Sequence, residues 1–320
     1  MDISRREFFK NTATKTGAGI AAMMVPAVLK GASQNELATM IDLRKCIGCE
    51  SCVYACQESN QSKYPQPQKP FPKMYPEKVK VSDWSDKRDV TERLTPYNWL
   101  YIQRAQVEHN GEMTEVSIPR RCMHCQNPPC AHLCPFGAAH KENNGITTID
   151  PELCFGGAKC SAVCPWNIPQ RQTGVGPYLS VAPALAGNGV MYKCDRCFDK
   201  ISEGRMPACI EACPVGAQTI GPRDEIVARA KKMADEENLY LYGLDENGGT
   251  NTIYVSAVPF DKLNQAIEKG PGKPHLAKTE DTMARTDVLA GALLTAPFAG
   301  AVASVTGFYR QIKKYFGEKK

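Results

Sequence analysis

Residues 46–56 read CIGCESCVYAC and place four cysteines at the spacing C-x2-C-x2-C-x3-C. Related spacings recur further along the 320-residue chain, so that all fifteen cysteines fall into four groups. The groups are Cys46, Cys49, Cys52 and Cys56; Cys122, Cys125, Cys130 and Cys134; Cys154, Cys160 and Cys164; and Cys194, Cys197, Cys209 and Cys213. Gly157 stands where the third group lacks its second cysteine. The repeat indicates one ligand pattern used four times.

This spacing is typical of iron–sulfur proteins, in which three close thiolates bind one cluster and the fourth cysteine reaches a second. A disulfide framework suits short exported chains with an even number of cysteines, whereas this chain is long and has fifteen. Zinc takes two separated pairs, which fits the fourth group alone but not residues 46–56. Covalent haem needs C-x-x-C-H, a run that the sequence lacks. The pattern therefore predicts iron–sulfur clusters.

The order of the groups predicts how they share ligands. Groups two and three lie about 20 residues apart, as in two-cluster ferredoxins whose groups exchange their last cysteines. Groups one and four flank this central module and are expected to pair with each other. The predicted ligand sets are set 1, Cys46, Cys49, Cys52 and Cys213; set 2, Cys56, Cys194, Cys197 and Cys209; set 3, Cys122, Cys125, Cys130 and Cys164; and set 4, Cys134, Cys154 and Cys160. Sets 1 to 3 each predict a [4Fe-4S] cluster, and set 4 has one corner without a thiolate.

The predicted fold class is α+β, with nested bacterial-ferredoxin-like two-cluster units, a β-hairpin insertion and one C-terminal transmembrane helix. The hairpin joins strands 98–107 and 113–118 at Asn110-Gly111, a strong turn signal. Other expected elements are strands at 145–149 and 252–255 and helices at 223–238 and 261–268. The four-cluster domain is expected over residues 33–268, with a central module, 118–170, nested within 40–221.

The two ends of the chain predict its location. Residues 1–32 carry Arg5-Arg6 ahead of a short apolar stretch, which is typical of a Tat export segment; an ordinary basic amphipathic helix is the alternative. Tat transport carries folded proteins, which suits clusters inserted before export. We therefore expect the cysteine domain at the periplasmic face of the inner membrane.

Residues 288–309 contain no charged side chain and are long enough to cross a bilayer, although a buried or surface helix is the alternative. They follow a predicted linker, 269–287, and precede a basic tail, 310–320, which the positive-inside rule places in the cytoplasm. The formal net charge of +5 belongs mostly to the two ends, and nothing in the remainder points to nucleic acid.

The motifs around the cysteines resemble those of the four-cluster ferredoxin subunits of membrane-bound oxidoreductases, the family of the dimethyl sulfoxide reductase B and nitrate reductase β subunits. The resemblance covers about residues 40–221 and rests on CIGC, RCMHC with PPC, and KCDRC. With the Tat segment and membrane tail, the architecture is most similar to the ferredoxin-type subunit of hydrogenase-2, and nearly as similar to iron–sulfur subunits of transmembrane complexes of sulfate reducers.

The resemblance implies a non-catalytic subunit that passes electrons between a redox partner and a polytopic, quinone-handling membrane subunit. The periplasmic partner would be a hydrogenase, a molybdenum enzyme or a multihaem cytochrome. Two other functions stay open at this point. One is an enzyme that binds substrate at the open iron of the Gly157 cluster, and the other is a structural anchor whose clusters only stabilise the fold.

Gly157 is the departure from a pattern of four cubanes. The related nitrate reductase subunit also lacks a cysteine at the equivalent position and holds a [3Fe-4S] cluster there, which the resemblance implies for set 4. The alternatives are a [4Fe-4S] cluster with water or Ser161 on the fourth iron, and an empty site. A [3Fe-4S] centre carries less negative ligand charge than a [4Fe-4S] centre. Because cluster type and net charge set the reduction potential, we expect the potential of set 4 to be higher.

A few residues beside the cysteines have predicted roles. His124 is expected to donate a hydrogen bond to a cluster sulfur rather than to bind iron. Arg121, Lys159 and Arg196 are either charges that favour a reduced cluster or ordinary solvated charges. Trp166, which follows Cys164-Pro165, is expected to pack beside a cluster.

Overall fold

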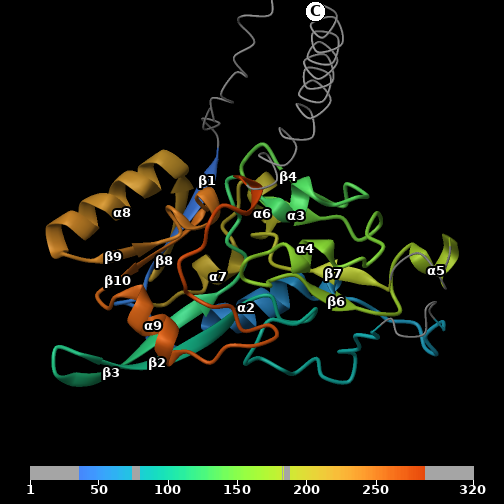
Figure 1. Cartoon of the computed structure of the whole chain (residues 1–320), viewed down its shortest axis with the longest axis horizontal. Helices are drawn as coiled ribbons and strands as arrows, with labels where there is room; N and C mark the ends of the chain where they lie inside the picture. Colours follow the sequence, from blue (N-terminus) through green and yellow to red (C-terminus); the bar gives the residue numbers. More distant parts are fainter. Residues whose placement is uncertain (1–35, 74–79, 182, 184–187, 285–320) are drawn as a thin grey trace, which may run out of the picture. The chain divides into compact units, whose positions relative to one another are not determined.

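The structure of the chain is a computed structural model in which residues 36–73, 80–181, 183 and 188–284 are described (Figure 1). The predicted export segment, 1–32, and the predicted membrane helix and tail, 288–309 and 310–320, lie outside the described residues. Within the ranges that are described, no helix combines the length and apolar character needed to span a bilayer. All fifteen cysteines are included in these ranges.

Short helices alternate with short strands along the described residues. The helices are α2 (Ser51–Asn60), α3 (Pro129–His132), α4 (Lys159–Ala162), α5 (Tyr178–Val181), α6 (Phe198–Ser202), α7 (Ala208–Glu211), α8 (Arg223–Glu237) and α9 (Phe260–Ala266), with 3-10 turns η1 (Gln61–Lys63) and η2 (Glu246–Gly248). The strands are β1 (Leu37–Asp42), β2 (Tyr101–His109), β3 (Glu112–Arg120), β4 (Ala139–Lys141), β5 (Thr147–Ile149), β6 (Gln170–Gln172), β7 (Val190–Tyr192), β8 (Gln218–Pro222), β9 (Tyr240–Tyr242) and β10 (Thr252–Ser256). This mixture confirms the predicted α+β class.

A four-stranded sheet joins parts of the chain that lie far apart in sequence. Its strand order is β8-β1-β10-β9, and β1 runs parallel to β10 and antiparallel to β8. Met40 is paired with Ile253 on one side and with Thr219 on the other. Because β1 precedes the first cysteine group and β8 follows the fourth, their pairing brings the ends of these two groups together.

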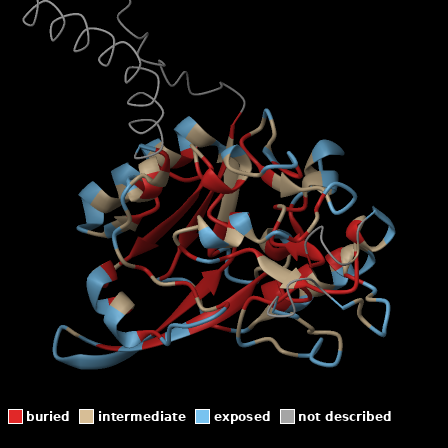
Figure 2. Cartoon of the chain, turned by 45° about the vertical axis from the view of Figure 1, so that its right-hand side comes forward, coloured by how far each residue is buried: buried red, intermediate tan, exposed pale blue. Residues whose placement is uncertain are grey.

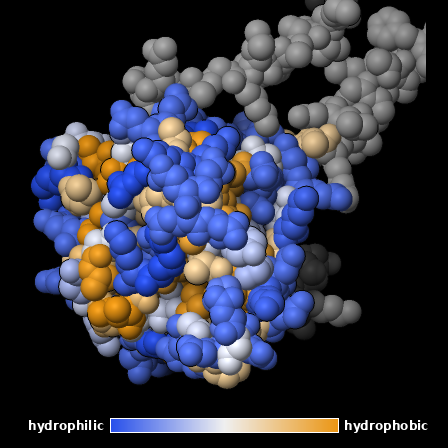
Figure 3. Space-filling model, turned by 90° about the vertical axis from the view of Figure 1, so that its left-hand side faces the viewer, coloured by the Kyte–Doolittle hydropathy of each residue, from blue (hydrophilic) through white to orange (hydrophobic). Residues whose placement is uncertain are grey.

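Helix α8 covers one face of this sheet (Figure 1). Met40 and Ile253 of the sheet pack against Ile226 and Ala230 of α8, and all four are buried. The helix follows the predicted periodicity and ends at Asn238, which takes a left-handed conformation with φ 55°. Its outer side is polar and belongs to a mostly hydrophilic face of the molecule (Figure 3). The cysteine groups belong to a separate, larger core cluster.

The predicted hairpin forms from β2 and β3. Asn110 and Gly111 both have positive φ, 54° and 82°, as a tight turn between right-twisted strands requires. The two strands are in register from Tyr101 with Arg120 to His109 with Glu112. The first strand therefore begins three residues after its predicted start and ends two residues after its predicted end, and the second begins one residue early and ends two residues late. The base of the hairpin is buried in the core and its tip is exposed (Figure 2).

Helix contacts join the cysteine groups in pairs. Helix α2 carries Cys52 and Cys56 and packs against α7, which carries Cys209. Helix α3 carries Cys130 and packs against α4, which carries Cys160. Group one therefore meets group four, and group two meets group three, which is the nested arrangement predicted from the spacing.

The described part of the predicted linker, residues 269–284, differs from a flexible connection because it packs on the domain. Leu276 is 1% exposed and belongs to the main core. Arg120 Nη2 donates to the carbonyl of His275 at 2.7 Å, and the Tyr242 hydroxyl donates to the carbonyl of Ala277 at 3.0 Å. The content of proline, glycine and charged residues predicted a linker, because composition carries no information about these buried contacts.

Candidate iron–sulfur cluster sites

None of the fifteen cysteines forms a disulfide, and ten of them are buried. Thiols buried in apolar surroundings resist ionisation unless positive charge or hydrogen-bond donors compensate. Among the described residues, no three His, Cys, Asp or Glu side chains come together as ligands of a single metal ion. The thiols instead form wider groups, as suits a polynuclear cluster in which each thiolate binds a different iron.

The cysteines of predicted set 1 lie around the start of α2. Burial raises the pKa of Cys46, and the neighbouring charges of Cys213 and Cys49 raise it further. Burial also raises the pKa of Cys52 to about 12, with contributions from Cys209, Cys46 and Cys213. Cys49 is the exposed thiol of the four; its Sγ lies 3.4 Å from Ser51 Oγ, which lowers its pKa.

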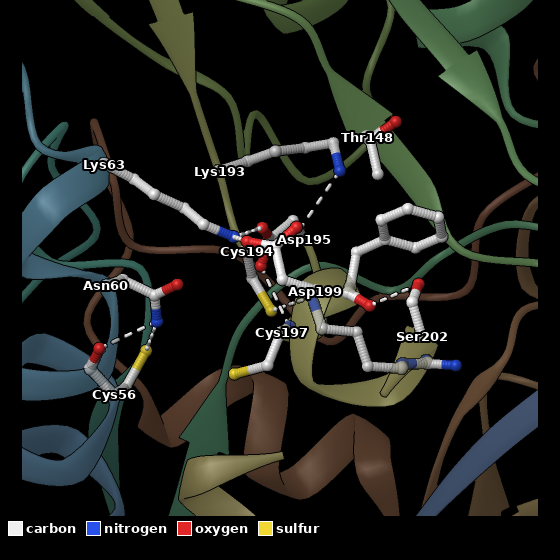
Figure 4. Close-up of polar contacts among 12 residues, drawn as sticks. Cys56, Asn60, Lys63, Thr148, Lys193, Cys194, Asp195, Cys197, Asp199 and Ser202 are labelled. Carbon is white, nitrogen blue, oxygen red and sulfur yellow. Dashed lines mark hydrogen bonds and ion pairs between the residues drawn. The ribbon is translucent and has the colours of Figure 1, made fainter. Parts of the chain in front are cut away.

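The cysteines of predicted set 2 lie between α2, α6 and α7. Burial raises the pKa of Cys56 far above its ordinary value, and the charges of Cys194, Cys209 and Cys197 act in the same direction. Asn60 Nδ2 donates to the Cys56 carbonyl at 2.8 Å and lies 3.7 Å from its Sγ (Figure 4). The structure thus brings these four thiols and one amide donor together.

The four cysteines of predicted set 3 line one small pocket. Trp166 and Lys193 also line this pocket, so Trp166 packs beside the thiols as predicted. Its Nε1 donates to the Tyr242 hydroxyl at 2.8 Å, which leaves the indole satisfied and 2% exposed. Four thiols gathered beside an aromatic ring and a cation are a donor set that fits an anionic cluster.

The three cysteines of predicted set 4 also lie near one another. Burial raises the pKa of Cys160, and the charges of Cys130, Cys154 and Cys134 add to the effect. Gly157 has an ordinary φ, and a Cβ added to it meets nothing within 4 Å. Gly156 differs, because its φ is +66° and an added Cβ would lie 2.4 Å from the Gly189 carbonyl oxygen. The backbone at Gly157 therefore leaves room for a side chain. The ligand sets themselves stay a prediction.

Left-handed residues turn the chain inside each cysteine loop, and backbone N–H groups of one such loop and of strand β7 point at sulfur. His124 and Arg196 occupy matching positions in the second and fourth groups, with φ 48° and 55°. The Arg196 N–H donates to Cys194 Sγ at 3.3 Å, and the Met191 N–H donates to Cys154 Sγ at 3.4 Å. Such bonds favour a charged sulfur over a neutral one.

His124 is placed as a donor to sulfur. Its Nδ1 accepts the Thr147 N–H at 3.1 Å, so the neutral ring carries its proton on Nε2. Burial and the charges of Arg196, Lys193 and Arg121 lower the pKa of His124, which keeps the ring neutral. Nε2 lies 4.0 Å from Cys194 Sγ, a cysteine of the fourth group rather than of its own.

The predicted charged residues differ in their surroundings. Lys159 is exposed, whereas Arg121 and Arg196 are each 3% exposed. Arg121 Nη1 lies 2.8 Å from Cys209 Sγ, and its Nε and Nη2 find no acceptor among the described residues. Buried, orphaned N–H groups beside thiols are what an anionic cluster with sulfide acceptors would satisfy, so the residues present fit the predicted cofactor.

Two polar residues near set 2 were given no role from the sequence. Lys63 pairs with Asp195 at 2.7 Å and with Asp199 at 2.6 Å, and so ties the end of α2 to the fourth group (Figure 4). Lys193 is buried and lines the set 3 pocket. Lys193 directly precedes Cys194, just as Arg121 directly precedes Cys122. This position beside a cysteine is the sequence signal that could have identified Lys193 as a functional residue.

Comparison with protein families gives two matches, both to 4Fe-4S dicluster domains. One match covers residues 45–138 and the other residues 113–223. Together they include every cysteine, and they overlap at the second group. The matched regions correspond to the interlocked helices and loops described above.

Three curated relatives are similar over most of this chain. The nitrate-inducible formate dehydrogenase iron-sulfur subunit of Escherichia coli K12 is 30% identical, over 69% of this chain and 68% of the relative. The Hydrogenase-2 operon protein HybA of Escherichia coli O157:H7 is 28% identical, over 82% and 83%. A tetrathionate reductase subunit of Salmonella typhimurium is 29% identical, over 78% and 86%.

Proposed function

This chain belongs to the family of 4Fe-4S dicluster iron–sulfur subunits of oxidoreductases, and we propose that it relays electrons between a periplasmic redox partner and a quinone-reactive membrane subunit. Bound iron–sulfur clusters supply one-electron redox chemistry. The chain's own contribution is to hold the clusters in a series, exclude water and supply donors and charges around them.

The observation that carries this proposal is the way neighbouring ligand sets adjoin. Besides burial, Cys209 of set 2 raises the pKa of Cys52 of set 1. In the same way, Cys122 of set 3 raises the pKa of Cys194 of set 2, and Cys130 of set 3 raises the pKa of Cys160 of set 4. Clusters held at these four sets would adjoin in the order 1-2-3-4 and would supply a path for one-electron steps.

We assign [4Fe-4S] clusters to sets 1, 2 and 3 and a [3Fe-4S] cluster to set 4. Three thiolates suit three irons, and Gly157 contributes none. Ser161, the candidate oxygen ligand, donates its hydroxyl proton to Asn167 Oδ1. That bond favours the three-iron cluster over a cubane with a serine ligand.

The location and partners are part of the same proposal. Residues 1–32 would export the folded chain by the Tat route, 288–309 would anchor it, and 310–320 would remain in the cytoplasm. The names of the relatives, a formate dehydrogenase subunit and a tetrathionate reductase subunit, support a catalytic partner subunit. A hydrogenase, a molybdenum enzyme or a multihaem cytochrome could take that place.

Potentiometric EPR on the full-length chain, purified without oxygen, tests the proposal. The expected result is one signal from an oxidised [3Fe-4S] centre and three [4Fe-4S] centres that become paramagnetic on reduction. Clusters that do not titrate would overturn electron transfer in favour of a structural anchor. A [4Fe-4S] signal perturbed by a small substrate would instead favour an enzyme acting at set 4.

A further inference from the structure

Arg121 is adjacent to one ligand set in the sequence but contacts another in space. The residue directly precedes Cys122 of set 3. Its guanidinium instead reaches Cys209 of set 2, with Nη1 2.8 Å from Sγ. The positive charge therefore serves the cysteines of set 2.

Lys193 shows the reciprocal arrangement. It directly precedes Cys194 of set 2, but its side chain lines the pocket formed by the four cysteines of set 3. Its Nζ donates to the carbonyls of Thr147 and Cys194. The positive charge of Lys193 thus faces set 3.

Neither cation is neutralised by a carboxylate. In the described part of the chain, no carboxylate forms an ion pair with Arg121 or Lys193. Asp195, which follows Cys194, pairs with Lys63 instead (Figure 4). Arg121 and Lys193 are 3% and 6% exposed, so water screens their charges little. Cys209 of set 2 is the sulfur that Arg121 contacts, and the cysteines of set 3 share a pocket with Lys193.

Arg196, the third buried cation here, has a different use. It donates to the carbonyls of Leu37 and Asn251, at 2.6 and 2.8 Å, and to Thr252 Oγ1 at 3.1 Å. These bonds tie the loop of the fourth group to β1 and to the start of β10. Both Nη atoms of Arg196 are thus bonded to the protein and only its Nε lacks an acceptor, whereas Arg121 has two such groups, Nε and Nη2, among the described residues.

We propose that Arg121 and Lys193 are positioning residues that set the reduction potentials of the clusters at sets 2 and 3. The arrangement is crossed, because each cation acts on the set that it does not adjoin in sequence. Arg121 raises the reduction potential of the cluster at set 2, and Lys193 raises that of the cluster at set 3. The inference rests on the proposed function, because it assumes that both sets hold redox-active clusters. A fixed positive charge favours the reduced state, which is one unit more negative.

The crossing has a functional consequence. Sets 2 and 3 belong to different two-cluster units, so the step between them is the one that links the outer unit to the central module. Matched positive charges on both sides keep the two potentials close. Removing one charge alone would introduce a difference in potential, and so would slow transfer in one direction.

The test is to replace each cation in the full-length protein and titrate the clusters by EPR. We expect Arg121→Met to lower the equilibrium constant for reduction of the set 2 cluster about tenfold, which lowers its reduction potential by about 59 mV for a one-electron couple. Lys193→Met should do the same to the set 3 cluster. Lys159→Met, which removes an exposed charge, should shift no potential. A Cys209→Ser variant identifies the set 2 signal.

The outcomes are distinct. A shift in the cluster next to the mutated residue in sequence, or no shift in either variant, would overturn the crossed arrangement while wild-type clusters still titrate. If wild-type clusters do not titrate, the proposed function itself fails. If Arg121→Met loses iron, selective loss of the set 2 cluster supports the inference and selective loss of the set 3 cluster contradicts it. Arg121→Lys, which keeps the charge, should restore most of the potential.

Discussion

Replacing Gly157 with cysteine should convert the cluster at set 4 from [3Fe-4S] to [4Fe-4S]. Gly157 is exposed, has an ordinary φ and leaves open space where a Cβ would stand. A side chain is therefore added without backbone strain or a clash. The stability of the fold should change by no more than about 1 kcal/mol, since replacing a glycine at a compatible backbone conformation stabilises slightly.

The size of the effect follows from ligand counts. Three cubanes and one three-iron cluster amount to about 15 irons per chain, and Gly157→Cys should raise this to about 16. The EPR signal of the oxidised [3Fe-4S] centre should disappear, and a new reducible [4Fe-4S] centre of lower potential should replace it. Iron and sulfide analysis together with spin quantitation measures both changes.

Two neighbouring variants serve as controls. Gly157→Ala fills the same space without a thiolate and should keep the [3Fe-4S] signal. Gly156→Ala should be poorly tolerated, because its φ is +66° and its Cβ would lie 2.4 Å from the Gly189 carbonyl oxygen. We expect it to cost about 2–5 kcal/mol from the left-handed conformation and the clash combined. A full [3Fe-4S] signal in Gly157→Cys would refute the assignment of set 4.

Three further predictions concern the fold, each measured as the midpoint of thermal unfolding unless stated. Met40→Ala should cost about 2–5 kcal/mol, because Met40 is 2% exposed between the sheet and α8. Glu36→Gln should cost about 1–3 kcal/mol, because it leaves Lys141, 2.5 Å away, without its carboxylate. Burial raises the pKa of Glu36, but bonds from Lys141 and Gln126 outweigh it and lower the pKa, so the stabilisation is present above about pH 4.5 and is lost below the folded pKa. Leu276→Ala should release residues 269–284 and make the lysines of this segment accessible to trypsin, as seen by limited proteolysis.

Each of these has a control or a contrary result. Met113→Ala, at a site that is 69% exposed, should change stability by less than about 0.5 kcal/mol. A Glu36→Gln difference that shrank between about pH 8 and pH 6 would mean that Glu36 titrates higher than its contacts imply. Unchanged proteolysis in Leu276→Ala would show that other contacts hold the segment.

Local sequence signals were enough to predict much of this protein. The cysteine spacing implied the nested pairing of the groups, which the contacts of α2 with α7 and of α3 with α4 then displayed. Asn110-Gly111 placed the hairpin, and apolar periodicity placed α8. These signals act over a few residues, because turn conformation, helix periodicity and ligand spacing depend on neighbours along the chain.

Other features depended on parts of the chain that are distant in sequence. The partners of β1, strands β8 and β10, lie more than 170 residues away, and no local pattern identifies them. The same holds for the burial of Leu276 in a segment with the composition of a linker. Arg121 and Lys193 had equally visible places beside cysteines, but the sequence does not say which cluster each side chain faces.

The amino-acid sequence by itself determined the kind of site: fifteen thiols in four groups, with one corner missing at Gly157. Only the tertiary structure decided which cysteine Arg121 contacts and which pocket Lys193 lines. The physical reason is the distance in sequence over which each property is determined. The type of ligand depends on single residues and their near neighbours, whereas the electrostatic environment of a buried site is the sum over side chains that only folding brings together.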